Sequence, residues 1–256
     1  MIKKRLITCS VIWVTVVISA LFAYGKTDAR KPAKGSAEYK FIFPKNYLSN
    51  YFSFADELVP ADNIQVTRKM RHSLVKSSYN NVQSYILQEE AVKIFPVIVP
   101  ILNYYGIPED FKYLPLVEAG LKSGVSKRGA AGWWQFMAGT ARTYGLKVGN
   151  GKDERYNVRK ATIAACKYLK ELHDQFHTWT LAAAAYNIGE IKMAKAIKMQ
   201  SQRDYYRMHF NPETGTYLYR IIAMKQVIEQ PELYGYRRKM PQPVNLQPTG
   251  LLAINN

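Results

Sequence analysis

Apolar side chains recur at helical spacing through the central part of the chain. Leu169, Leu172 and Phe176 follow one another at intervals of three and four residues, which predicts one buried face of a helix over residues 160–176. Two further helices are predicted in the same way, over residues 190–199 and 214–228, and an alanine-rich helix is predicted over residues 180–187. Strand-like alternation of apolar and polar residues is scarce, so we expect a mainly α-helical protein.

Two prolines interrupt the helical pattern of residues 89–105. Proline lacks a backbone N–H and its ring crowds the preceding turn, so Pro96 and Pro100 predict a kink or a break. Pro108 suits the first turn of a new helix, which we expect to run to Glu118.

The ends of the chain differ from its centre. Residues 1–5 carry three basic side chains and residues 6–24 carry no charge, which is typical of an export signal. We expect residues 1–25 to be a cleaved signal peptide or a retained N-terminal anchor, and residues 26–45 to be a linker. Residues 241–256 contain three prolines and predict an extended C-terminal tail. The protein is therefore expected to be exported to the periplasm or cell envelope.

The chain of 256 residues has a formal net charge of +17, which favours a polyanionic partner. Export argues against nucleic acid and favours a cell-wall polymer or the surface of the cell envelope. Cys166 is the single cysteine outside the export segment, so no internal disulfide is expected and a buried, inert thiol is predicted.

A pair of histidines has the spacing of a metal site without the rest of one. His173 and His177 are four residues apart, but the glutamate of the zinc-protease pattern is replaced by Asp174 and no third ligand is evident. We expect two histidines near a helix C-terminus, where the helix dipole favours them, and we predict no metal and no cofactor.

A carboxylate and a group of aromatic rings are the strongest candidates for chemistry. Glu118 follows the apolar residues Leu116 and Val117, and apolar surroundings keep a carboxyl protonated near neutral pH, as a general acid requires. The rings of Trp133, Trp134 and Phe136 can stack on sugars or form a buried cluster. The amide of Gln135 can bind sugar hydroxyl or acetamido groups, and we expect the small residues 129–132 to let a ligand approach the backbone.

Five segments resemble the soluble lytic transglycosylase (SLT) domain family, and more narrowly its membrane-bound D type. The segments are "LPLVEAGL", "SKRGAAGWWQFMAGTARTYGL", "DERYNVRKATIAACKYLKEL", "TLAAAAYNIGEI" and "ETGTYLYRIIA", which occur in the family's order and spacing. The N-terminal segment "FADELVPADNIQVTRKM" also resembles the family, so the likeness covers about residues 50–230. It implies a lysozyme-like, goose-type helical domain over residues 106–240, preceded by a helical N-terminal extension over residues 46–105.

The resemblance also implies roles for individual residues. Glu118 corresponds to the catalytic acid/base, and Tyr217 corresponds to the tyrosine that orients it. The substrate-binding residues implied are Trp134, Gln135, Phe136, Met137, Tyr186 and Asn187. The chain departs from the family at Ala119, where a serine is usual, which bears on the rate more than on the type of reaction.

The reaction implied is cleavage of the β-1,4 bond between N-acetylmuramic acid and N-acetylglucosamine in peptidoglycan, with formation of a 1,6-anhydro ring. Glycan strands are then the partner, and Glu118 is the sole acid/base. Two alternatives stay open. A lysozyme-type hydrolase needs a second carboxylate, for which Asp153 and Glu154 are the nearest candidates, although they have a structural role in the family. A non-catalytic peptidoglycan-binding or scaffold protein is favoured by Ala119.

Overall fold

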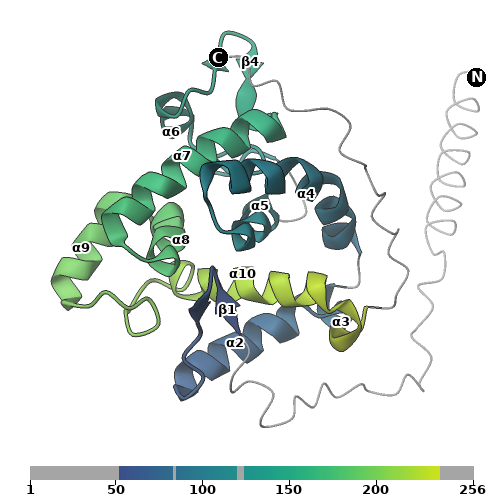
Figure 1. Cartoon of the computed structure of the whole chain (residues 1–256), viewed down its shortest axis with the longest axis vertical. Coiled ribbons are helices and arrows are strands. Elements are labelled where there is room, and N and C mark those ends of the chain that lie inside the picture. The colour runs from purple at the N-terminus through teal and green to yellow at the C-terminus, as the bar shows by residue number, and fades with distance from the viewer. Residues whose placement is uncertain (1–51, 83–84, 120–123, 237–256) are drawn as a thin grey trace, which may run out of the picture. The chain divides into compact units, whose positions relative to one another are not determined.

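A computed structural model describes residues 52–82, 85–119 and 124–236 (Figure 1). The predicted segments 1–25, 26–45 and 241–256 lie outside the described residues. The helices of this part are α2 (Ile64–Ser77), α3 (Tyr79–Val82), α4 (Ile86–Tyr105), η1 (Glu109–Tyr113), α5 (Leu114–Ala119), α6 (Ala138–Thr143), η2 (Glu154–Tyr156), α7 (Val158–Phe176), α8 (Trp179–Ile188), α9 (Glu190–Gln200), α10 (Thr214–Glu229) and η3 (Pro231–Tyr234). The prediction of a mainly α-helical protein is confirmed.

The strands of the described residues form two short antiparallel hairpins. In the first, β1 (Ser53–Phe54) pairs with β2 (Glu57–Leu58), with Phe54 opposite Glu57. In the second, β3 (Val148–Gly149) pairs with β4 (Lys152–Asp153). None of the helices in the described part of the chain is both long and apolar enough to cross a membrane.

Helix α4 continues through both of its prolines, so a break there was a wrong prediction. The helix is held by its buried face, to which Ile94, Ile98 and Leu102 contribute. Pro96 and Pro100 are one turn apart on the exposed side. The two prolines donate no backbone hydrogen bond, so two carbonyl groups of the preceding turns lose their partner. These carbonyl groups lie on the exposed side of the helix, where water can bind them.

The first turn after α4 also differs from the prediction. Pro108 precedes the 3-10 helix η1 rather than lying inside an α-helix, and α5 then begins at Leu114. The predicted position of Glu118 near the end of a helix is confirmed, because α5 ends at Ala119.

Helix α7 has the predicted buried face, with Leu169 and Leu172 fully buried and Phe176 almost so. Its first turn is capped by the Asn157 side chain, which accepts a hydrogen bond from the backbone of Lys160. Cys166 lies on the same face, and burial raises the pKa of its thiol to about 12. The predicted burial of this thiol is confirmed.

Helix α8 is the alanine-rich helix that carries Tyr186 and Asn187. Its residues 180–185 are all buried, and four of them are alanines, which lets α7 and α10 pack close to it. The backbone N–H groups of Trp179 and Thr180 donate hydrogen bonds to the carboxylate of Glu57 in β2. A negative charge at a helix N-terminus is stabilising, so the first hairpin fixes the start of α8.

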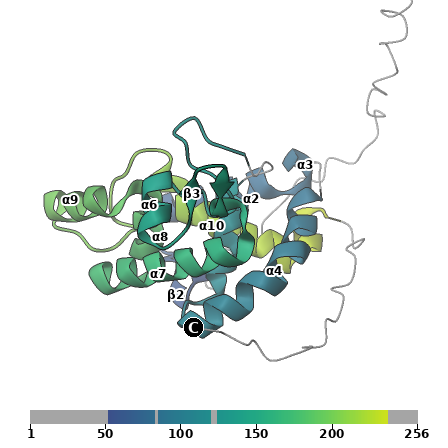
Figure 2. The ribbon, with the colours of Figure 1, turned by 90° about the horizontal axis from the view of Figure 1, so that it is seen from above.

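Helix α10 lies between α2 on one side and α4 and α5 on the other (Figure 1). Seen from above, α9 lies at the edge, away from α4 (Figure 2). Residues of the N-terminal extension share the core, since the ring of Phe54 packs edge-on against Phe111 at 4.9 Å and Asp110 accepts a hydrogen bond from the backbone of Ala55. The division into an extension over residues 46–105 and a domain over 106–240 stays a prediction.

Candidate active site

Glu118 lies near the end of α5, directly after the buried side chains of Leu116 and Val117. Its own side chain is half-buried. Burial raises the pKa of this carboxyl from its ordinary value of 4.5 to about 7. A carboxyl whose pKa is raised toward neutrality can both donate and accept a proton.

Three side chains of α10 and the turn before it act on Glu118. The hydroxyl of Tyr217 donates a hydrogen bond to the Glu118 carboxyl, and this bond lowers the carboxyl's pKa. The positive charge of Arg220, one turn further on, lowers it as well, while the charge of Glu213 raises it. Arg220 also donates to the carbonyl oxygen of Val117 at 3.2 Å and so holds the last turn of α5. Sequence analysis missed the roles of Glu213 and Arg220: both lie in the segment "ETGTYLYRIIA", but their nearness to Glu118 comes from packing between α5 and α10.

The segment 124–137 forms a loop in which Trp134 and Phe136 are buried and Trp133 is half-buried. The ring of Trp134 is fully buried, and its indole N–H donates to the hydroxyl of Thr162 on α7 at 3.0 Å. Phe136 is also buried, and its backbone pairs with that of Ala131. Both rings therefore support the loop from below. Of the two possibilities for these rings, stacking on sugars or a buried cluster, the buried cluster applies to Trp134 and Phe136.

Arg155 fixes this loop from behind. The buried guanidinium group donates to the carbonyl oxygen of Gly129 at 2.8 Å and to that of Phe136 at 3.0 Å. Asp153 accepts three further hydrogen bonds from it, the shortest at 2.6 Å. Glu154 pairs with Lys160 at 2.7 Å. The expected structural role of Asp153 and Glu154 is confirmed, and neither carboxylate is free to act as a second catalytic group.

Gly132 was expected to let a ligand approach the backbone, but the structure gives another reason for a glycine at this position. A Cβ atom at this position would lie 1.9 Å from the carbonyl oxygen of Arg155, and the backbone of Gly132 has a φ of +76°. The close approach at Gly132 is therefore to the protein's own backbone and not to a ligand. The expectation of an open surface at Gly132 was wrong, because η2 occupies the space beside it.

Gln135 and Met137 are the loop residues that are nearest to solvent among the predicted ligands. The amide of Gln135 is half-buried and donates to the carbonyl oxygens of Gly132 at 2.8 Å and Gly124 at 3.1 Å. These bonds leave its amide oxygen available as an acceptor. The side chain of Met137 is 45% exposed.

Tyr186 and Asn187 at the end of α8 connect this loop to α10. The hydroxyl of Tyr186 donates to the carbonyl oxygen of Trp134 at 2.8 Å, and the amide oxygen of Asn187 accepts from the hydroxyl of Thr214 at 2.8 Å. Burial and the charge of Glu118 both raise the pKa of Tyr186 well above its usual value, so this phenol is neutral at any physiological pH. The structure thus brings the residues around Glu118 together from α5, the loop, α8 and α10.

The two histidines of α7 lie outside this assembly. His173 stacks on the ring of Trp179 with centroids 3.9 Å apart, and His177 ends the helix in a left-handed conformation. Among residues 52–82, 85–119 and 124–236, no cluster of three or more metal-binding side chains occurs.

Comparisons with known proteins agree with the motifs of the sequence. Residues 99–209 match the model of a family described as the transglycosylase SLT domain. The chain is also 34% identical over 138 residues to membrane-bound lytic murein transglycosylase D of Escherichia coli K12, and equally to that of E. coli O6:H1 strain CFT073. These matches cover 52% of this chain and 30% of each relative, so the chain spans less than a third of the length of these relatives.

A solved structure was matched as well. It is that of an inactive mutant of the lytic transglycosylase Slt from Pseudomonas aeruginosa, which is 19% identical to this chain. The match has a TM-score of 0.39 and covers 58% of this chain and 25% of the other.

Proposed function

Because residues 99–209 match the model of the transglycosylase SLT domain family, we propose that this chain is a peptidoglycan lytic transglycosylase. Its substrate is the β-1,4 bond between N-acetylmuramic acid and N-acetylglucosamine, and its product carries a 1,6-anhydro ring. The observation that carries the proposal is the half-buried carboxyl of Glu118, whose pKa of about 7 suits a group that first gives and then takes a proton.

In the proposed reaction, protonated Glu118 donates its proton to the glycosidic oxygen as the bond to the anomeric carbon breaks. The 2-acetamido group of the muramoyl sugar stabilises the positive charge on that carbon. The Glu118 carboxylate then removes the proton of the 6-hydroxyl group of the same sugar, and O6 bonds to the anomeric carbon. The proton balance closes on Glu118, and no water is consumed.

The other candidate residues have supporting roles in this proposal. Tyr217 orients the Glu118 carboxyl through its hydrogen bond. Gln135, Met137 and Asn187 are at least partly exposed and contact the sugars directly. Trp134, Phe136 and Tyr186 hold the loop and the end of α8 in position under the sugars, since Tyr186 donates to the Trp134 carbonyl group and its ring packs against Phe136.

A lysozyme-type hydrolase is the second candidate, and Glu213 is the observation that favours it. Its charge raises the pKa of Glu118, so a second carboxylate lies near enough to be felt by the first. A hydrolase would activate water with such a group and leave a reducing end. The side chain of Glu213 is exposed just before α10 and has no hydrogen bond or ion pair among the described residues that would hold it in place for this task.

The place of action that we propose is the cell envelope. The relatives from E. coli are named as membrane-bound, and residues 1–25 have the composition of an export signal or anchor. The net charge of +17 favours attraction to the anionic cell wall.

Mass spectrometry of the fragments released from purified sacculi tests the function. We expect muropeptides with anhydro ends, each one water lighter than the hydrolysed form, and almost no release by Glu118→Gln. Reducing ends as the main product would establish the hydrolase. A wild-type protein that binds sacculi and releases nothing would establish the non-catalytic alternative.

A further inference from the structure

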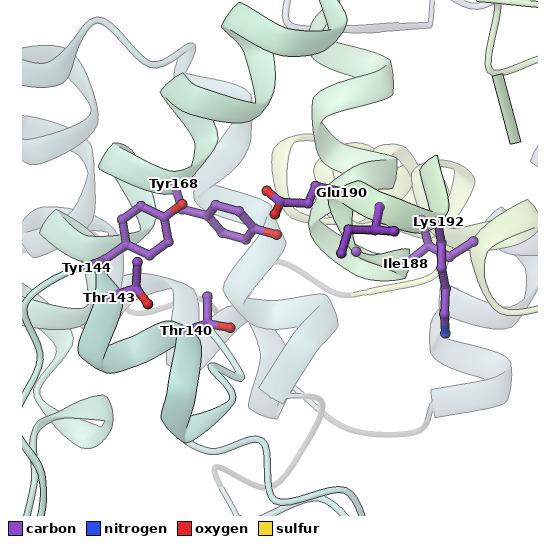
Figure 3. Close-up of a pocket in the computed structure, with 9 residues that line it drawn as sticks. Thr140, Thr143, Tyr144, Tyr168, Ile188, Glu190 and Lys192 are labelled. Carbon is purple, nitrogen blue, oxygen red and sulfur yellow. The ribbon is translucent and has the colours of Figure 1, made fainter. Parts of the chain in front are cut away.

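A pocket of about 390 Å³ lies where α6 faces the junction of α8 and α9 (Figure 3). Tyr144 and Tyr168 form one wall, with their ring centroids 5.0 Å apart. The ring of Tyr168 lies 5.3 Å from that of Tyr186, and the pocket residue Ile188 follows Asn187 directly. The pocket therefore adjoins the proposed cleavage site.

Glu190 and Lys192 are the two charged residues that line this pocket. The Glu190 side chain is half-buried and forms no ion pair with any of the described residues. Figure 3 shows its carboxylate pointing toward the tyrosines, while the amine of Lys192 points away from it. Burial and the charge of Glu190 together raise the pKa of Tyr168 to about 12, in agreement with a carboxylate held close to that phenol.

The chemistry of this wall suits an alkylammonium group. An unpaired carboxylate attracts the charge, and the faces of two aromatic rings can bind a cation and the methylene groups next to it. The hydroxyl of Tyr144 is directed to Glu171 at 2.8 Å, which holds its ring in place.

We propose that the pocket binds the free side-chain ammonium group of the diamino acid in a peptidoglycan peptide stem. This inference rests on the proposed function. The diamino acid is the third residue of the stem, and three extended residues span roughly 10 Å, which is enough to reach from a muramoyl sugar at Tyr186 into the neighbouring pocket. Cross-linking turns this ammonium group into a neutral amide. The pocket therefore makes the enzyme prefer glycan strands whose stems are not cross-linked.

Binding to sacculi with and without free amines tests the pocket directly. The amines are blocked by N-acetylation, and the protein carries Glu118→Gln so that the sacculi stay intact. We expect about fivefold tighter binding to unmodified sacculi, the size of an accessible ion pair, and no preference once Glu190→Gln is added. Glu89→Gln removes the same charge from an exposed site on α4 and should keep the preference.

Acetylation makes the sacculi more anionic. Non-specific charge attraction alone would therefore make this basic protein bind acetylated sacculi more tightly than unmodified ones. Equal or weaker binding to unmodified sacculi overturns the proposal, and so does a preference that survives Glu190→Gln. Both outcomes are independent of catalysis.

Turnover separates a failure of the pocket from a failure of the proposed function. Wild-type protein that releases no anhydro ends from strands stripped of their stems contradicts the function. The pocket is tested by the ratio of turnover on stem-bearing strands to turnover on stripped strands. We expect this ratio to fall about fivefold in Glu190→Gln and to stay the same in Glu89→Gln. An unchanged ratio in Glu190→Gln overturns the pocket and leaves the function standing.

Discussion

The hydroxyl of Tyr217 donates a hydrogen bond to the carboxyl group of Glu118, although the two residues are 99 positions apart in the chain. The bond joins the first turns of α10 to the end of α5. It opposes the effect of burial on the carboxyl's pKa, and the balance of the two leaves that pKa at about 7. The acid strength of Glu118 is thus a property of how two helices pack.

Tyr217→Phe tests this balance. Loss of the hydrogen bond removes an interaction that favours the ionised carboxyl, so the apparent pKa in the pH profile of kcat/KM should rise above 7. Activity should fall by up to about tenfold, the value of one hydrogen bond. Tyr219→Phe removes a hydroxyl from the same helix and should leave the apparent pKa as it is. An identical shift in both variants would mean that the helix had moved.

Glu118→Gln should stabilise the protein at high pH. The folded-state pKa of Glu118 is raised from 4.5 to about 7, so the folded protein holds a proton that the unfolded chain releases between these values. The free energy of unfolding of the wild type therefore falls as pH rises from about 4.5 to about 7, and glutamine has no such dependence. We expect a gain of about 2 kcal/mol for the variant at pH 8 and little at pH 4, measured by urea unfolding. A gain that is equal at both pH values would contradict the raised pKa.

Gly132→Ala should be far more damaging than Gly129→Ala. Both glycines have positive φ values, so both substitutions carry the cost of a left-handed alanine, about 1 kcal/mol. Only at position 132 does the new Cβ atom meet the Arg155 carbonyl oxygen, and the shift required there should cost a further 2 kcal/mol or more, on the order of an overpacked core site. Thermal unfolding of the two variants measures the difference. Similar melting temperatures would mean that the loop is not held against η2.

Glu57→Gln should weaken the start of α8. The carboxylate caps two backbone N–H groups there, and loss of its charge should cost about 1 kcal/mol of stability. Since α8 ends at the residues proposed to contact substrate, turnover should fall as well. Asp62→Asn, at an exposed site before α2, is the matched control. Full activity in Glu57→Gln would mean that the contact between the first hairpin and α8 does not affect the active site.

The local sequence pattern was sufficient to predict the main helices and the position of Glu118 near the end of one of them. Apolar spacing predicted the buried face of α7, because a helix must turn the same side to the core every three or four residues. The apolar residues before Glu118 predicted the direction of its pKa shift, although the value also depends on the contacts with Tyr217 and Arg220 of α10. The pairing with Tyr217 came from the family resemblance alone.

Packing between distant segments decided the rest. Pro96 and Pro100 signal a break in sequence, yet α4 continues through them because both lie on its exposed side. Gly132 signals room for a ligand, yet the backbone of Arg155 fills that room. Glu190 follows a helix end like any surface carboxylate, and only the fold sets it beside Tyr144 at the end of α6 and Tyr168 of α7. Each outcome depends on which residues from elsewhere in the chain occupy the neighbouring space, and one-dimensional periodicity carries no information about that.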